Sequence, residues 1–428
     1  MADFENIIGY DYVKKAFTDM LVTMNQSKNL MEAGVRVPHS LLLRGSDHRG
    51  KAFMAKEFVK ASGRTEFECG FDTMDDETAE TLTKLFFNPP PNKKYIINLT
   101  DLDLIVEEKG ELFENILFVM YEDARKKELQ DNFFFIATVE DYDSLPPEMK
   151  EFFHDMIFID LPHPDDTFEI YHHLLTKKNI IIEMGDYDAT KALAIKSYHS
   201  IEQILDKALI LEQRKNPTDL LYQLPIFISA DSFSDAVLDF FYNKGLHSGK
   251  RDPLGLERFS FHEAGHALAA ELLQPGIVGF AALNEDTVSE SGGGVFLCRN
   301  WKRTAWENEA DVVMNLAGKA AEEIAYGKDF GGAANDIRDS YKRLVYQVVC
   351  DGIYGLEFTH PCRSNESISG GLLSKQEKAA IQARLIKDFS AAKKLITDHR
   401  KALDKIAKAL WETGFVPASV IQKAIEEG

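Results

Sequence analysis

Several features that mark secreted or membrane proteins are scarce or absent in this sequence. Its 428 residues include only four cysteines, far apart and without a C-x-x-C pair. So few cysteines argue against a disulfide framework and favour a reducing compartment. The sequence also lacks an uncharged apolar run of the roughly 18 residues that a membrane helix needs, and its first residues form no apolar signal segment. We therefore expect a soluble cytoplasmic protein without a membrane anchor.

Positive charge is in deficit. Lysine and arginine number 49 against 69 aspartates and glutamates, which gives a formal net charge of -20. A field of this sign repels nucleic acids and anionic membranes. We therefore expect no nucleic-acid partner, and we interpret the excess as a solvated acidic surface.

Residues 1–164 alternate short apolar runs with amphipathic segments. The runs begin near Ser40, Tyr95, Phe133 and Met156, and polar residues, proline or glycine bound each of them. Continuous apolar runs are typical of parallel strands that are buried on both faces. Because helical stretches separate them, we predict an α/β domain with a parallel sheet.

The rest of the chain has mainly helical patterning. Helical periodicity fills residues 165–213, and the segment KGLHSGKRDPLG at 244–255 has the glycines and proline of a linker. We predict three parts: an α/β subdomain at 1–164, a helical subdomain and connection at 165–243, and a mainly α-helical C-terminal domain at 244–428.

The C-terminal domain contains the motif HExxH within FHEAGHALAAELLQPG. His262 and His266 are four residues apart, so on a helix they share one face and both imidazoles can reach one zinc ion. Glu263 directly follows the first histidine, where its carboxylate can accept a proton from the attacking water. The motif alone is moderate evidence, because a catalytic zinc also needs a third protein ligand.

Asp336 is the candidate for that third ligand. It follows a glycine-rich turn in GKDFGGAANDIRDSY and starts a segment with helical periodicity. A carboxylate there can equally serve as a helix N-terminal residue that the helix dipole favours. Position alone leaves these two interpretations equal.

Three segments in this order resemble a known family. HEAGHAL, NLAGKAAEEIAYG and GGAANDI are similar to the peptidase domain of the FtsH family of AAA proteases, and the N-terminal FENIIGYDYVKKAF is similar to that family's AAA module. The resemblance implies an AAA-like α/β module with a helical lid, followed by a zinc metallopeptidase domain. It implies that Asp336 is the third zinc ligand.

The same resemblance points to residues around the metal. It implies that Glu322 or Glu323 of KAAEE supports the site from behind the ligands, and a solvated helix face is the other interpretation. The stretch from Gly292 to Phe296 falls where the family has an edge strand that can accept a substrate backbone. A simple glycine turn explains that stretch equally well.

The region that resembles a phosphate-binding loop departs from the family pattern. Gly45, Gly50 and Lys51 are present and are the residues that can still contact a nucleotide. The position after the lysine, where a serine or threonine binds Mg²⁺, is Ala52. Asp47 between the glycines would repel phosphate.

The Walker B strand should end in Asp-Glu. In YIINLTDLD these positions are Thr100 and Asp101, or Asp101 and Leu102 if the register slides by one residue. In either register one essential carboxylate is missing.

Two further hydrolysis residues are absent. Val139 stands where the family has its sensor asparagine. No arginine occurs between Arg125 and Arg214, the region that carries the family's arginine finger. We therefore do not expect ATP hydrolysis, and nucleotide binding stays open.

Together these patterns predict a zinc-dependent endopeptidase that cleaves peptides or unstructured proteins without ATP. Two alternatives remain: an ATP-dependent FtsH-like protease, and a non-catalytic scaffold. Family resemblance also predicts a homo-oligomer, a hexamer, because members of the family form six-membered rings.

Overall fold

The computed structural model describes residues 4–35, 37–46, 48–71, 73, 75–91, 93–124, 132–153, 155–217, 225–242, 253–284, 292–299, 305–328, 333–349 and 373–428. The chain divides into two compact units. One comprises residues 1–174 with 196–202, and the other residues 175–195 with 203–428. The three-part division expected from the sequence remains a prediction.

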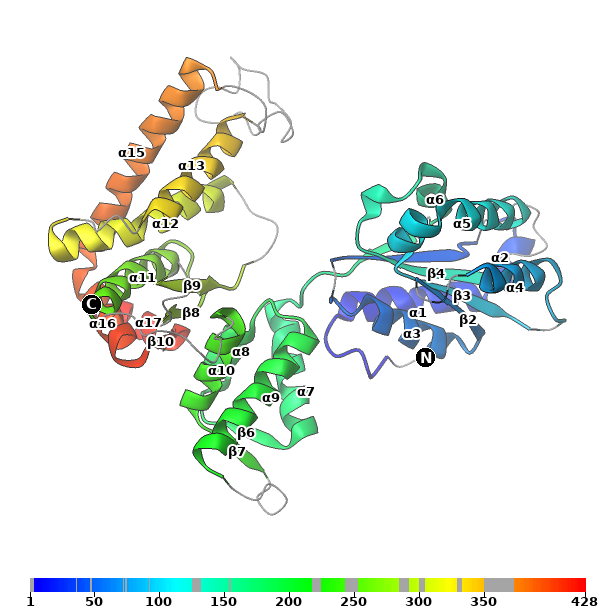
Figure 1. Ribbon diagram of the computed structural model, residues 1–428, viewed down its shortest axis with the longest axis horizontal. Coiled ribbons are helices and arrows are strands. Elements are labelled where there is room, and N and C mark those ends of the chain that lie inside the picture. The colour runs from blue at the N-terminus through cyan, green and yellow to red at the C-terminus, as the bar shows by residue number, and fades with distance from the viewer. Residues whose placement is uncertain are drawn as a thin grey trace. The chain divides into compact units, whose positions relative to one another are not determined.

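A parallel sheet of five strands forms the centre of the N-terminal unit (Figure 1), in the order β2-β3-β4-β1-β5. The four predicted apolar runs form four of its strands. The fifth, β2, has a largely exposed TEFECG sequence that carries no such signal, because it lies at an edge of the sheet. The strands are β1 Ser40–Arg44, β2 Thr65–Gly70, β3 Tyr95–Thr100, β4 Phe133–Val139 and β5 Asp155–Phe158.

Helices cover both faces of this sheet, and the central strand β4 shows why its sequence is apolar throughout. Phe134 packs on Phe58 of α3, with ring centroids 5.6 Å apart, whereas Phe133 packs on Phe86 of α4 at 5.0 Å. Because successive strand side chains point to opposite faces, the apolar run packs against helices on both faces of the sheet. The helices are α1 Asp11–Asn25, α2 Ser27–Glu32, α3 Lys51–Ser62, α4 Asp76–Phe87, α5 Leu102–Ala124 and α6 Pro147–Phe152.

The segment from residue 164 to 242 is mainly helical but includes two strands that the sequence analysis missed. Ile180–Ile182 (β6) and Ile226–Ile228 (β7) pair in parallel. Strands of three residues are too short to show a period-2 pattern, so helical periodicity dominated the prediction. The helices are α7 Pro164–Lys178, α8 Asp186–Leu193, α9 Tyr198–Lys215 and α10 Ala230–Tyr242.

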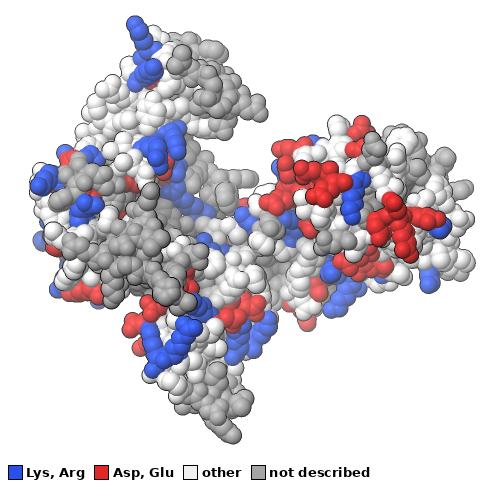
Figure 2. Space-filling view, viewed as in Figure 1, with Lys and Arg blue, Asp and Glu red and all other residues white. Residues whose placement is uncertain are grey.

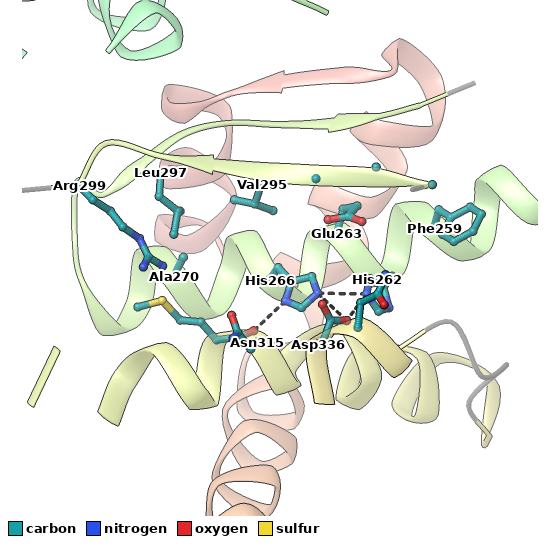
Figure 3. Close-up of a pocket in the computed structure, with 15 residues that line it drawn as sticks. Phe259, His262, Glu263, His266, Ala270, Val295, Leu297, Arg299, Asn315 and Asp336 are labelled. Atoms are coloured by element: carbon teal, nitrogen blue, oxygen red, sulfur yellow. Dashed lines mark hydrogen bonds and ion pairs between the residues drawn. The ribbon is translucent and has the colours of Figure 1, made fainter. Parts of the chain in front are cut away.

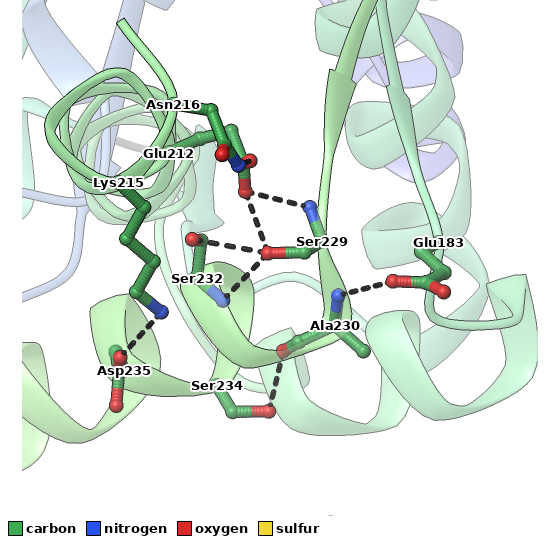
Figure 4. Close-up of polar contacts among 9 residues, drawn as sticks. All are labelled: Glu183, Glu212, Lys215, Asn216, Ser229, Ala230, Ser232, Ser234 and Asp235. Atoms are coloured by element: carbon green, nitrogen blue, oxygen red, sulfur yellow. Dashed lines mark hydrogen bonds and ion pairs between the residues drawn. The ribbon is translucent and has the colours of Figure 1, made fainter.

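A buried carboxylate joins α9 to the start of α10 (Figure 4). Glu212 accepts hydrogen bonds from the hydroxyl and the backbone N–H of Ser229, at 2.6 and 3.0 Å. Asn216 donates a further bond at 2.7 Å, and Glu183 accepts from the backbone N–H of Ala230. Two carboxylates thus satisfy N–H groups at the N-terminal end of α10, where the helix dipole favours negative charge.

The C-terminal part packs helices against an antiparallel three-stranded sheet in the order β10-β8-β9 (Figure 1). The expectation of a largely helical domain omitted this sheet. The elements are α11 Pro253–Leu273, β8 Val278–Leu283, β9 Gly293–Leu297, α12 Ala305–Tyr326, α13 Ala334–Val349, α15 Lys375–Asp398, α16 Arg400–Thr413, β10 Phe415–Pro417 and α17 Ala418–Glu426.

The distribution of acidic side chains and the hydropathy of the helices can be compared with the expectations of an acidic surface and of no membrane helix. On the face drawn in Figure 2, acidic side chains gather on the N-terminal unit. Within the described ranges, no helix combines the length and the apolar character needed to cross a bilayer.

We predict that Glu212→Gln destabilises the protein in a pH-dependent manner. Hydrogen bonds from Ser229 lower the pKa of Glu212 from 4.5 to about 2. A lowered folded-state pKa gives stability, worth up to about 3 kcal/mol, that is complete above pH 4.5 and lost as the pH falls through 2. Urea unfolding should therefore separate Glu212→Gln from wild type most strongly near pH 7, and the difference should vanish near pH 2.

The exposed Glu169 of α7 provides the control for this experiment. Glu169→Gln should unfold like wild type at every pH. A Glu212→Gln difference that did not shrink below pH 4.5 would show that the ionised carboxylate is not what stabilises this region.

Candidate metal centre

Helix α11 presents both histidines of HExxH toward α12 and α13 (Figure 3). His262 and Glu263 are buried, with relative exposures of 6% and 7%, and His266 is half-buried. The four-residue spacing places the two imidazoles on one face, with ring centroids 4.7 Å apart.

Asp336, in the first turn of α13, completes a compact group with them. Its Oδ2 lies 3.0 Å from Nε2 of His262 and 3.5 Å from Nε2 of His266, and the two Nε2 atoms are 3.0 Å apart. Among the described residues, these three offer ligand atoms that all lie within 4.8 Å of one another. The structure thus brings together the three side chains that the sequence singled out.

The Nδ1 atoms of the two histidines, which point away from Asp336, form hydrogen bonds that fix the orientation of each ring. Nδ1 of His262 faces the Glu322 carboxylate at 2.8 Å, and Nδ1 of His266 faces the backbone carbonyl of Met314 at 2.7 Å. Both partners accept hydrogen bonds, so each Nδ1 carries a proton and both Nε2 atoms face Asp336. Two Nε2 atoms and a carboxylate at such distances need positive charge between them.

The pKa values of His262 and Asp336 also indicate that the site favours positive charge. Burial by itself would lower the pKa of His262, but hydrogen bonds with Asp336 and Glu322 raise it to about 10. Burial would raise the pKa of Asp336, but hydrogen bonds with the two histidines hold it well below its usual range. The site therefore stabilises positive charge between the imidazoles, which either protons or a metal ion can supply.

Gly318 of α12 leaves the room that an ion requires. A Cβ built on Gly318 would meet Nε2 of His266 and lie 2.7 Å from Nε2 of His262. A side chain of any size would therefore fill the space between the nitrogens. Zinc bonds to nitrogen of about 2.0–2.1 Å place two tetrahedral ligands roughly 3.3 Å apart, close to the spacing of the two Nε2 atoms.

A cleft of about 310 Å³ opens beside this group. The edge strand β9 forms one wall and α12 with the start of α13 forms the other, while Glu263 lies between α11 and β9 (Figure 3). Burial raises the pKa of Glu263, and the neighbouring histidines oppose the rise. A carboxylate in such a place can accept a proton and pass it on.

Gly293 and Gly294 lie in strand β9 and not in a turn, and Gly292 directly precedes the strand. A Cβ on Gly293 would lie 2.7 Å from Cγ of Glu263, and a Cβ on Gly292 would meet the ring of Phe259. The backbone of β9 therefore lies directly on α11, and only glycine permits this approach.

Glu322 and Glu323, which the sequence could not separate, have different surroundings. Glu322 is 1% exposed and accepts from His262. Glu323 forms ion pairs with Lys319, at 3.0 Å, and with Lys393. Glu322 is therefore the residue that orients a candidate ligand.

Two features of the site were missed by the sequence analysis: Gly318 and the Met314 carbonyl. A glycine inside a helix costs roughly 1 kcal/mol relative to alanine, so Gly318 in NLAGKAAEE carried a signal that some packing or site requirement exists. A backbone carbonyl carries no sequence signal.

Gly45 and Gly50 lie in the loop between β1 and α3, and Lys51 is the first residue of α3. Gly50 has a φ of +83°, and Nζ of Lys51 donates to the backbone carbonyl of Ser46 at 2.9 Å. Arg49 pairs with Asp160 at 2.9 Å, so the loop is held by groups of its own unit. Asp47 lies outside the described residues.

Of the positions that correspond to Walker B, Thr100 ends strand β3 and Asp101 follows it. Leu102 is fully buried and carries no carboxylate, so the slid register offers only the exposed Asp101. Asp103, also buried, accepts the backbone N–H groups of Glu140 and Asp141 at 3.0 and 2.8 Å. This carboxylate orders the loop after β4.

Comparisons with known proteins cover both parts of the chain. Residues 41–161, from β1 to β5, match the family described as "ATPase family associated with various cellular activities (AAA)". A crystal structure of the FIGL-1 AAA domain in complex with ADP aligns with a TM-score of 0.47 and 14% identity, over 55% of this chain and 83% of that chain. That similarity is too low to decide the fold.

Curated relatives span nearly the whole chain at low identity. The ATP-dependent zinc metalloprotease FtsH of Ureaplasma parvum is 21% identical over 96% of this chain and 58% of its own length. FtsH 3 of Symbiobacterium thermophilum is 21% identical over 99% of this chain and 71% of its own. FtsH 2 of Petrotoga mobilis is 22% identical over 99% of this chain and 70% of its own length. The chain thus spans between about three fifths and seven tenths of these relatives.

We predict that Glu322→Gln weakens zinc binding by about 10- to 100-fold, because the group that orients His262 loses its charge. Glu323→Gln, the matched control, should leave zinc affinity within about twofold, since Glu323 contacts lysines. Competition against a zinc-binding dye measures both. Equal losses in the two variants would mean that the pair acts through general charge and not through His262.

Proposed function

We propose that this chain, which carries an AAA ATPase domain and is homologous to FtsH zinc metalloproteases across most of its length, is a zinc-dependent endopeptidase. The observation that carries the proposal is the convergence of His262, His266 and Asp336, whose inward atoms all lie within 4.8 Å of one another. We propose these three as the zinc ligands. Two nitrogens and one carboxylate oxygen match the donor set of catalytic zinc.

Each remaining group then has a defined part in hydrolysis. Zinc, when bound, supplies a Lewis acid that polarises the scissile carbonyl and favours deprotonation of water. The carboxylate of Glu263 accepts the proton of the attacking water and delivers it to the leaving amine nitrogen. Glu322 and the Met314 carbonyl fix the histidine rings through their Nδ1 protons.

The cleft favours an extended peptide as substrate. Strand β9 lies along it and pairs with β8 on one side, so its other edge can hydrogen-bond a peptide backbone by β-addition. An extended segment has to be free of its own tertiary structure to bind in this way. We therefore propose peptides and unstructured protein segments as substrates of a cytoplasmic homo-oligomer, with six subunits by resemblance to the family.

The role of ATP has two candidate answers. The relatives carry names that state ATP dependence, and a matched AAA family favours an ATP-driven FtsH-like protease. The residues of this chain favour ATP-independent cleavage, since Ala52 stands at the magnesium position and Thr100 at a Walker B carboxylate. The comparisons support the first candidate more strongly, and the residues make the second one testable.

We predict that substitutions can separate zinc binding from the role of Glu263 as the base. The purified chain should bind about one zinc ion. Glu263→Gln should keep the zinc and lower kcat for an unstructured peptide by about 10²- to 10⁴-fold, because the proton acceptor is lost. Gly318→Ala should lose zinc and activity together, since its Cβ occupies the space between the imidazoles.

Glu257→Gln, an exposed position on α11, is the control and should resemble wild type in both assays. Near-normal turnover by Glu263→Gln would refute the mechanism. Zinc binding without any cleavage by the wild-type chain would favour the scaffold alternative.

We predict from the nucleotide-site residues that peptide cleavage proceeds equally with and without ATP and Mg²⁺, and that no phosphate is released. Loss of an arginine finger alone costs roughly 10³ to 10⁵ in rate in related phosphoryl-transfer enzymes. Parallel assays of peptide cleavage and phosphate release measure this. ATP-dependent cleavage that Lys51→Ala abolishes would instead establish the ATP-driven protease.

A further inference from the structure

A polar side chain interrupts the apolar part of the cleft. Beyond His266 the walls are formed by Ala270, Val295, Leu297 and Met314, and Asn315 lies among them on the α12 side (Figure 3). Arg299 also lines this end of the cleft, and its guanidinium is paired with Asp311. Within the described parts of the chain, no residue hydrogen-bonds the side-chain amide of Asn315. When a ligand displaces the water that is hydrogen-bonded to an amide in an apolar cleft, binding becomes less favourable unless the ligand supplies a hydrogen bond in its place.

Helical spacing places Asn315 beside the proposed zinc position. Asn315, Gly318 and Glu322 follow at intervals of three and four residues, so they share one face of α12. Gly318 lies under the two imidazoles and Glu322 holds His262. Asn315 is therefore one turn before Gly318, about 4.5 Å along the helix axis, in the direction away from Glu322.

Strand β9 and Asn315 lie on opposite walls of the cleft. An extended peptide has N–H and C=O groups along both of its edges, and β9 can satisfy only one of them. Groups on the other edge face α12, where the side chain of Met314 offers no hydrogen-bond partner. Asparagine has both a donor and an acceptor, as a peptide group does.

We propose that Asn315 binds substrate by hydrogen-bonding a backbone peptide group on the edge that faces away from β9. This inference rests on the proposed peptidase function. It adds a substrate-binding residue on the α12 wall to the ligands and the base. The contact is to backbone atoms, so it orients the chain beside the scissile bond without selecting a side chain.

Peptide binding to an inactive variant tests the inference. In a zinc-loaded Glu263→Gln background, Asn315→Leu, which keeps the branch at Cγ but has no polar atom, should raise the Kd of a fluorescent unstructured peptide by about tenfold. Gln382→Leu replaces an exposed amide on α15 and should leave the Kd within twofold. Asn315→Ala should match Asn315→Leu. Zinc content should stay at one per chain in all variants.

An ester scan separates a substrate contact from a structural role. In these peptides one backbone N–H at a time, near the scissile bond, is replaced by an ester oxygen. On the edge that faces α12, one ester should weaken binding to the Glu263→Gln background several-fold and cost nothing in the Asn315→Leu variant, whereas esters on the edge that faces β9 should weaken binding equally in both proteins. Weakening by the same factor in both proteins at every sensitive position, or an unchanged Kd for Asn315→Leu, would overturn the inference.

The two proposals fail in distinguishable ways. If the wild-type chain binds no zinc and cleaves no peptide, the proposed function is wrong. If it cleaves peptides while the Asn315 variants bind them normally, the peptidase stands and the assignment of Asn315 is wrong.

Discussion

The candidate metal centre depends on how closely helix α11 packs on α12. A Cβ on Gly265 would lie 2.6 Å from the carbonyl oxygen of Ala317 and 2.6 Å from the Cβ of Ala321, so the two backbones approach as only small residues permit. This approach puts Gly318 beneath His262 and His266. Larger residues at the crossing would move the imidazoles away from Asp336 and open the group of three.

The other side of α11 is equally close to its neighbour. Gly292 and Gly293 let β9 lie against Phe259 and Glu263, which fixes the position of the carboxylate relative to the edge strand. The helix that carries the reactive side chains is thus held from both sides by backbone. Such support limits the motion of the groups that act together in the proposed hydrolysis.

The N-terminal unit illustrates how fold and chemistry separate. Its sheet is stabilised by aromatic packing on both faces of β4, and Phe58, which packs on it from α3, lies two turns beyond Lys51. A residue in the first turn of α3, such as Ala52, can therefore vary without affecting the core. This is why an AAA domain can be recognised here by sequence while its use of ATP has to be measured.

The sequence by itself determined the local patterns. The apolar runs defined four of the five parallel strands, because strands buried on both faces need uninterrupted apolar sequence, and the spacing of His262 and His266 placed both on one helix face. It also supplied Asp336, although only through a family resemblance. Tertiary structure alone decided the rest. The choice of Glu322 over Glu323, the Met314 carbonyl and the room left by Gly318 depend on which surfaces meet across α11 and α12, and contacts between distant segments leave no periodic trace in the chain.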